Sequence, residues 1–210
     1  MTYSMLAARA VIAAAALALV ALAALHVLKP EIHPSRSMIS QYALGRHGWV
    51  MALCFATFAA GSAFLFAALV ADLTSLHGRI GLTLLLAASV GLAMAARFPM
   101  DPVSTPPAQL SLSGRMHSIA FMVGVPCQVL AVLLLSVALA QRTSHAALPL
   151  LVLTAVVWAS LVAMITIMVI VGPGKPPNPD GPERFLGFPN RLFMVAYGVW
   201  LMVTAWPAAR

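Results

Sequence analysis

The sequence contains little charge for its length. Only 8% of its 210 residues are Asp, Glu, Lys or Arg, and Asp and Glu together number five. A soluble domain carries roughly 25% charged residues, because its surface faces water. At the same time 62% of the residues are hydrophobic, which is more than a single core of this size can bury. Both observations exclude a soluble domain and predict that lipid surrounds most of the chain.

The sequence is also poor in cysteine and lacks a cluster of basic residues. Its two cysteines, Cys54 and Cys127, lie inside apolar runs, where a thiol behaves as a small hydrophobic group. We therefore expect neither a disulfide nor a metal site from them. The twelve Lys and Arg residues give a net charge of +7, but they are spread singly, without the basic face typical of nucleic-acid binding. We expect membrane lipids as partners, no nucleic acid, and leave a homo-oligomer open.

What the sequence does contain is a series of long apolar runs. They lie at about residues 7–28, 48–71, 79–98, 116–140, 146–171 and 191–206. Each approaches the roughly 20 residues that a helix needs to cross the hydrocarbon core, and none shows the alternation typical of strands. Because backbone groups inside a bilayer must be satisfied within each segment, we predict an all-α fold. The expected architecture is a polytopic membrane protein, a single domain over residues 1–210 with six transmembrane helices.

The first run allows a second interpretation, and aromatic residues mark several predicted ends. Residues 7–28 also have the apolar stretch and small residues of a signal peptide, although the run is long for one. Tyr3, Tyr42, Trp49 and Trp206 fall near the ends of predicted spans. Amphipathic rings favour the headgroup layer, so we expect these four side chains at the membrane boundary.

The connections between the runs are unequal in length. Residues 72–78 and 141–145 form short links, whereas residues 29–47, 99–115 and 172–190 are long, polar and rich in proline. With six spans, the three long connections lie on one face of the membrane. Ordered loops held by a rigid scaffold often carry a binding or catalytic site. We therefore predict a polar pocket at the boundary on this face. The alternative is a solvated cap that only joins helices.

The long connections contain residues suited to binding an amphiphile. The candidate ligand-binding residues are Arg36, Tyr42, Arg115, Asn190 and Arg191. A guanidinium group matches the geometry of a phosphate or carboxylate, which suits a lipid headgroup. Apolar helix walls suit the tail of the same molecule. The sequence thus favours an amphiphilic or lipid ligand. A membrane scaffold or sensor without enzymatic activity remains an alternative.

Several short motifs together resemble a known family. They are Ser-x-x-Ser-x-Tyr-x-x-Gly at residues 37–45, Phe-Pro-x-Asp-Pro at 98–102, Gly-x-x-His at 114–117, and an arginine entering the last span. The chain resembles the bacterial membrane proteins of domain-of-unknown-function family 998 over nearly its whole length. That family usually carries Gln-Arg where this chain has Asn190 and Arg191. The resemblance implies a protein of the bacterial inner membrane and implies no activity.

An enzymatic alternative rests on three candidate catalytic residues, Ser40, Asp101 and His117. These side chains have the chemistry of a lipid hydrolase or transferase if they meet at one boundary. The set loosely resembles the alkaline ceramidase and adiponectin-receptor superfamily, which uses a serine, an aspartate and histidines around zinc. That superfamily has two histidines one helical turn apart in a late span, and the last two predicted spans here contain none. A catalytic zinc takes three protein ligands, so we predict no metal and no cofactor.

Each of these residues also has a structural alternative. His117 is suited to a hydrogen bond with a loop carbonyl or with Asp101, and Asp101 between two prolines is suited to capping a turn. Haem binding is not expected, because the chain has neither two pairs of histidines at helix depth nor a Cys-x-x-Cys-His motif. The predicted spans are almost wholly apolar, which disfavours a transporter. Gln128 is the most notable polar residue at mid-depth, and we expect it to bond to a neighbouring helix.

Overall fold

The computed structural model describes residues 2–142, 144–171 and 181–210, and the regular secondary structure in these ranges is helical. The six long helices are α1 (Tyr3–Leu28), α2 (Gly48–Leu69), α3 (Leu76–Arg97), α4 (Leu112–Ala140), α5 (Ser144–Val171) and α6 (Gly187–Ala209). Three short 3-10 helices join them, namely η1 (Ile39–Ala43), η2 (Pro107–Gln109) and η3 (Pro182–Phe185). All six long helices are long and apolar enough to cross a membrane. The predicted all-α class with six spans is confirmed, and the chain is an integral membrane protein.

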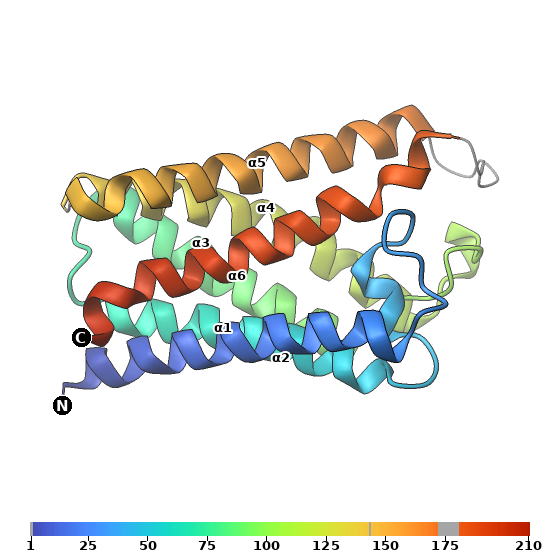
Figure 1. Cartoon of the computed structure of the whole chain (residues 1–210), viewed down its shortest axis with the longest axis horizontal. Coiled ribbons are helices and arrows are strands. Elements are labelled where there is room, and N and C mark those ends of the chain that lie inside the picture. Colours follow the sequence, from blue (N-terminus) through green and yellow to red (C-terminus); the bar gives the residue numbers. More distant parts are fainter. Residues whose placement is uncertain (1, 143, 172–180) are drawn as a thin grey trace.

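The helices form a bundle in which each packs against its neighbours in sequence. Helices α1 to α5 contact one another in order, and α6 packs against both α5 and α1 (Figure 1). Both termini lie at one end of the bundle together with the two short links. Residues 29–47 and 98–111 and the described part of the third connection lie at the opposite end, which we call the loop end. Residues 172–180 of the third connection lie outside the described ranges.

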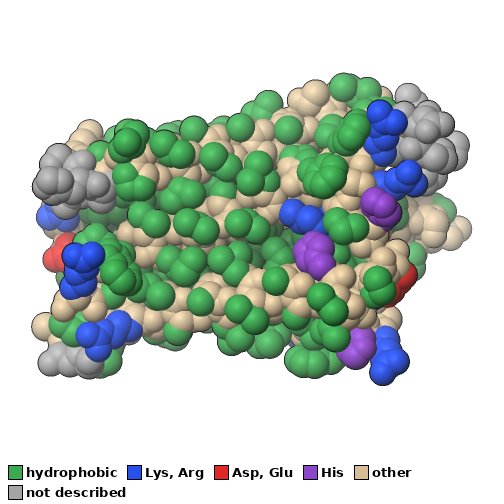
Figure 2. Space-filling model, in the orientation of Figure 1, with side chains coloured by type: hydrophobic (Ala, Val, Ile, Leu, Met, Phe, Trp, Pro, Cys, Tyr) green, Lys and Arg blue, Asp and Glu red, His purple; other side chains and the backbone are tan. Residues whose placement is uncertain are grey.

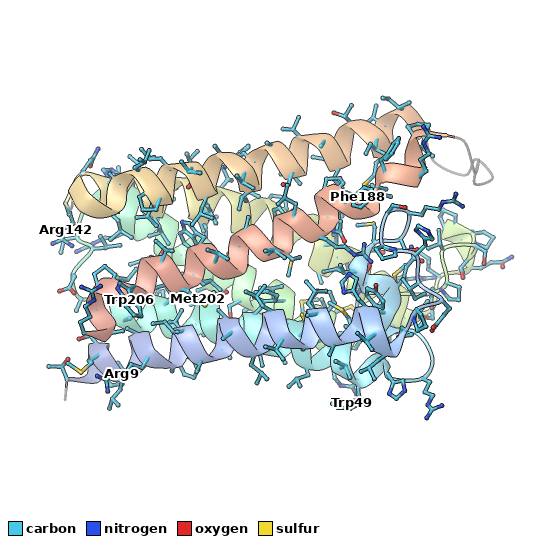
Figure 3. All side chains as sticks on the ribbon, in the orientation of Figure 1. Arg9, Trp49, Arg142, Phe188, Met202 and Trp206 are labelled. Carbon is cyan, nitrogen blue, oxygen red and sulfur yellow. The ribbon has the colours of Figure 1, made fainter. Side chains whose placement is uncertain are left out.

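The outer surface has the character expected in a bilayer. On the face in Figure 2, hydrophobic side chains cover the middle of the bundle, and most charged side chains lie toward its two ends. Trp49 and Trp206 are exposed near opposite ends (Figure 3), as expected for rings at the headgroup layer. Tyr42 differs from this expectation, because its side chain is completely buried.

Helices α3 and α4 begin before the apolar runs that predict them. The Ser75 hydroxyl accepts a hydrogen bond from the Gly78 amide at 3.3 Å, and the Ser111 hydroxyl accepts one from the Gly114 amide at 3.0 Å. A serine at this position satisfies an amide that has no partner inside the helix. The first turn of each helix is therefore fixed by a cap and contains polar residues, which hydropathy alone does not count as helical.

Polar side chains inside the bundle bond to one another across helices. Ser62 of α2 lies 2.6 Å from the Tyr197 hydroxyl of α6. The Trp200 indole donates to the Ser136 hydroxyl at 2.8 Å, and the Thr154 hydroxyl donates to the same oxygen at 2.8 Å. These bonds join α2 to α6 and α4 to both α5 and α6. They satisfy buried polar groups in the way that the sequence predicts for weakly polar spans.

Candidate functional site

A cavity lies inside the bundle at the loop end, beneath η1. Its volume is about 60 Å³. Its lining comes from η1 and its N-cap and from helices α2 to α6, namely Met38, Ile39, Ser40, Phe55, Gly91, Leu92, Ala95, His117, Ala120, Phe121, Gly124, Val125, Gln128, Met164, Asn190, Phe193 and Met194. The walls are mainly apolar, and four polar side chains interrupt them. This combination is typical of a small-molecule site.

Helix α4 contributes the longest wall of the cavity. Its lining residues run from His117 to Gln128 at spacings of three and four residues, which places them on one face of the helix. At 1.5 Å per residue this stripe extends about 16 Å along the helix. The residues that line the cavity therefore follow α4 from the loop end toward the middle of the bundle, and at about 60 Å³ the cavity is small.

A close approach of α3 and α4 forms one side of this cavity. A Cβ atom placed on Gly91 would lie only 2.8 Å from the Cα atom of Gly124. Both residues line the cavity. Only glycine allows two helix backbones to come this close, as is common in membrane bundles. The small side chains of Ala95 and Ala120 on the same two helices also leave room beside this contact.

Gln128 lies at the deep end of the cavity with an unsatisfied amide. Its side chain is 2% exposed, and its Nε2 atom has no hydrogen-bond partner among the described residues. The predicted bond to a neighbouring helix is therefore absent for this atom within those ranges. A buried donor without a partner costs about 1–3 kcal/mol. The indole nitrogen of Trp158 and the hydroxyl of Thr204 are likewise buried without a partner among the described residues, but of the three residues only Gln128 lines the cavity.

His117 lies at the loop end of the same stripe, and its ring orientation is fixed. Its Nδ1 atom is 2.9 Å from the carbonyl oxygen of Phe98, and because a carbonyl can only accept, Nδ1 carries the proton. In the neutral ring Nε2 is then an acceptor, and no described residue bonds to it. The loop-carbonyl bond is the structural alternative considered for this residue. It leaves a lone pair available at the cavity, which His117 lines.

Asn190 and Ser40 complete the polar residues of the cavity. The Asn190 Oδ1 atom accepts a hydrogen bond from the Ile39 amide at 2.8 Å, and its Nδ2 atom donates to the Met164 sulfur at 3.5 Å. Since an amide nitrogen has two protons and sulfur is a weak acceptor, Asn190 retains donor capacity. Ser40 is in η1 and lines the cavity. Asn190 thus holds η1 in place, and Ser40 forms part of the cavity wall beneath η1.

Asp101 lies outside the cavity lining and caps the start of α4. Its two carboxylate oxygens accept hydrogen bonds from the Ser111 amide and the Ser111 hydroxyl, both at 2.7 Å. A carboxylate at a helix N-terminus is also favoured by the helix dipole. The structure thus brings Ser40 and His117 to one cavity but gives Asp101 a capping geometry. Arg115 is exposed, and its Nε atom donates to the Leu110 carbonyl at 3.1 Å.

Arg191 fastens the first loop to α6. Its guanidinium donates to Nε2 of His26 at 2.8 Å, to the Ser37 carbonyl at 2.6 Å and to the Tyr42 hydroxyl at 3.0 Å. The Nδ1 atom of His26 lies 2.8 Å from the Leu22 carbonyl, so Nδ1 carries the proton and Nε2 accepts from Arg191. We call Arg191, His26 and Tyr42, with Lys29, the loop clasp. The guanidinium of Arg191, a candidate ligand-binding group from the sequence, is therefore bonded to residues of the chain itself.

Lys29 completes the loop clasp, and sequence reasoning missed it. Its side chain is buried, and its ammonium donates to the carbonyls of Tyr42 and Leu44. A lysine directly after an apolar run ordinarily extends to the headgroups, so its position alone gives no signal of burial. Arg36, in contrast, is an exposed residue of the same loop.

Among the described residues, no group of three His, Cys, Asp or Glu side chains is arranged to hold a metal ion. His117 has no second histidine or carboxylate in the cavity lining. The polar atoms that the cavity offers are neutral amide, hydroxyl and imidazole groups. These groups bind by hydrogen bonds, which directs the chemistry of the site toward recognition of a neutral polar group.

One family model matches nearly the whole chain. The model of a family described as protein of unknown function, DUF998, matches residues 12–207. The chain belongs to this family. The DUF998 match begins within α1 and ends within α6, so it includes the cavity and the loop clasp. No curated protein and no solved structure matches the chain significantly. Membership in DUF998 supplies no activity, so the function must be argued from the site.

Proposed function

We propose that this DUF998 protein binds an amphiphilic or lipid molecule in the cavity beneath η1. The observation that carries the proposal is a cavity with apolar walls that are interrupted by the four polar side chains of Ser40, His117, Gln128 and Asn190. Apolar walls favour a hydrocarbon chain. A few polar groups, placed at the two ends of the α4 stripe, fix the orientation of such a chain. This division is typical of ligand sites.

The size of the cavity indicates how much of the ligand it encloses. A volume of about 60 Å³ is smaller than the roughly 150 Å³ cavity that accommodates benzene in an engineered protein. The enclosed part is therefore one slender segment of an amphiphile. The rest of the molecule lies toward the loop end or the surrounding lipid. The uneven wall, with Phe121, Val125 and Met164 on adjacent helices, supplies the apolar contact for this segment.

A pair of matched variants tests the proposal. Val125 lines the cavity, whereas Val123, two residues earlier on α4, is 56% exposed on the outside of the bundle. Val125→Phe adds volume at the cavity wall, and Val123→Phe adds the same volume on the lipid side. Native mass spectrometry of each protein, purified in mild detergent, measures the retained small molecule. We expect the wild type and Val123→Phe to retain one adduct and Val125→Phe to lose it.

Two results would overturn this function. One is a wild-type protein that carries no adduct after purification from its own membrane. The other is an adduct that Val125→Phe retains as fully as Val123→Phe does. Either result would favour the scaffold or sensor alternative, because the cavity would then have no occupant.

We further propose that the membrane is the inner membrane of a bacterium. All six spans are helical, whereas bacterial outer-membrane proteins are typically barrels. Separation of the two membranes on a density gradient, followed by immunodetection, measures this directly. Recovery of the protein in the outer-membrane fraction would contradict the proposal.

A further inference from the structure

We infer that the ligand is a single-chain lipid alcohol whose hydroxyl group donates to Nε2 of His117. The inference rests on the proposed function and names the class of ligand for the same cavity. It follows from the absence of charge in the described lining, from the tautomer of His117 and from the small volume of the cavity.

No charged side chain lines the cavity among the residues that the structure describes. Three cations of the loop end, Arg191, Arg115 and Lys29, donate to backbone carbonyls, and no cation is among the described residues that line the cavity. A phosphate or carboxylate in the cavity would lie in an apolar environment without a counter-charge. Such burial of an isolated charge is strongly unfavourable. The polar group of the ligand is therefore neutral.

His117 determines which neutral group fits. Its Nδ1 proton is engaged by the Phe98 carbonyl, so Nε2 presents a lone pair and requires a donor. An ester, ether or ketone has no proton to donate. A hydroxyl group donates one hydrogen bond to Nε2 and accepts another from the amide of Asn190 or the hydroxyl of Ser40, both of which line the cavity. A hydroxyl thus satisfies both kinds of group at the loop end.

The shape of the cavity limits the rest of the ligand. A volume of about 60 Å³ is less than half of the roughly 150 Å³ that accommodates benzene, so the cavity encloses the hydroxyl group and a short segment of one chain. The apolar side chains of Leu92, Phe121 and Phe193 line the cavity around this segment. Two acyl chains side by side do not fit this volume. A single chain with a terminal hydroxyl has the shape and the hydrogen-bonding groups that the cavity requires.

The test compares three probes of equal chain length. Dodecanol, dodecyl methyl ether and dodecanoic acid are added in equal amounts to delipidated protein in a neutral detergent, and native mass spectrometry measures the adduct of each. The ether lacks the donor proton, and the acid is an anion near neutral pH. We expect the wild type to retain the alcohol about three- to tenfold more than the ether, the difference given by one neutral hydrogen bond.

A conservative variant isolates the contribution of the His117 Nε2 atom to binding. The side-chain amide of asparagine places a donor where histidine has Nδ1, so His117→Asn preserves the bond to Phe98 and removes Nε2. In this variant we expect the preference for alcohol over ether to disappear while the protein stays folded. His77→Asn, at the opposite end of the bundle where His77 bonds to Gln141, is the control and should keep the wild-type preference.

The outcomes separate the two proposals. If wild type retains the ether or the acid as well as the alcohol, and Val125→Phe loses all of them, the lipid-alcohol inference is overturned and the cavity function stands. If wild type retains none of the probes, or if Val125→Phe retains them equally, both proposals fail. A persistent alcohol preference in folded His117→Asn also overturns the role of Nε2.

Discussion

Buried polar residues of the same helix have different roles in this protein because their partners differ. Ser136 accepts hydrogen bonds from two neighbouring helices and is satisfied by the chain itself. Gln128, on the same helix, has an Nε2 atom without a partner in the described ranges. The first residue stabilises the bundle, whereas the second carries a cost that stability alone does not explain. This contrast distinguishes a structural residue from a candidate ligand-binding residue.

Replacement of Gln128 should therefore stabilise the empty protein. We expect Gln128→Leu to raise the free energy of unfolding of delipidated protein by about 1–3 kcal/mol, because it removes an unsatisfied buried amide at similar volume. Chemical denaturation in detergent measures the change. Ser136→Ala is the control of opposite sign, since it leaves the Trp200 indole without an acceptor. A loss of stability in Gln128→Leu would show that the amide has a structural partner.

Arg191 should contribute to stability through geometry that lysine cannot reproduce. The planar guanidinium reaches His26, Ser37 and Tyr42 at once, whereas an ammonium cannot donate in this fixed fork. We expect Arg191→Lys to lower the free energy of unfolding by about 3 kcal/mol. The exposed Arg36 gives the matched control, because Arg36→Lys should change the free energy of unfolding by less than about 0.5 kcal/mol. Equal effects of the two variants would refute the loop clasp.

The sequence identifies the residues at the loop end better than it identifies their contacts. The motifs single out Ser40, His117 and Asn190, which do line the cavity. They also single out Tyr42 and Arg191, which face each other inside the loop clasp. An arginine at a helix entrance has the same sequence signal whether it points to a headgroup or to a loop carbonyl. Tertiary contacts decide between the two orientations of the arginine, and these contacts depend on residues more than a hundred positions away in the sequence.

At the scale of elements, helix starts and loop anchors depend on short-range hydrogen bonds. Hydropathy predicts that the fourth span starts near residue 116, but α4 begins at Leu112 because Ser111 caps it. The cap is in turn held by Asp101. The first loop is anchored similarly to α6, where the Gly187 amide donates to the Ser35 carbonyl at 2.7 Å. A Cβ atom on Gly187 would collide with the Pro34 carbonyl, so this anchor requires glycine.

The two members of the α4 cap should be energetically coupled. We expect Asp101→Ala and Ser111→Ala each to lower the free energy of unfolding by about 1 kcal/mol, the usual effect of losing an N-cap. The double variant should lose less than the sum, because the two side chains share their bonds. A double-mutant cycle measures the coupling. Strict additivity would mean that Asp101 does not act through Ser111.

The contact between α3 and α4 should tolerate no added methyl group at Gly91. We expect Gly91→Ala to lower the free energy of unfolding by about 1–3 kcal/mol, as overpacking does. Gly61→Ala is the control, because its Cβ atom would meet only ordinary contacts at 3.6 Å or more and alanine is the better helix former. An equal response at the two positions would indicate that α3 and α4 are not in close contact.

At the scale of the whole molecule, the gathering of the long connections at one end is what creates the site. Six apolar runs with alternating short and long links predict this arrangement, and Figure 1 shows it for the described parts of the three connections. The cavity itself could not be predicted, because it depends on how Gly91, Gly124 and the small side chains near them leave space between helices. Lateral packing of this kind has no signature in hydropathy, which reports only that each helix is apolar.

The central claim of this account is that an amphiphile occupies the cavity, and a structure from crystals grown in a lipid phase tests it most directly. The predicted result is density for a segment of one chain in the cavity beside α4, with a polar atom within hydrogen-bonding distance of Nε2 of His117. A cavity that contains only water, or one that is closed by its own side chains, would contradict the account.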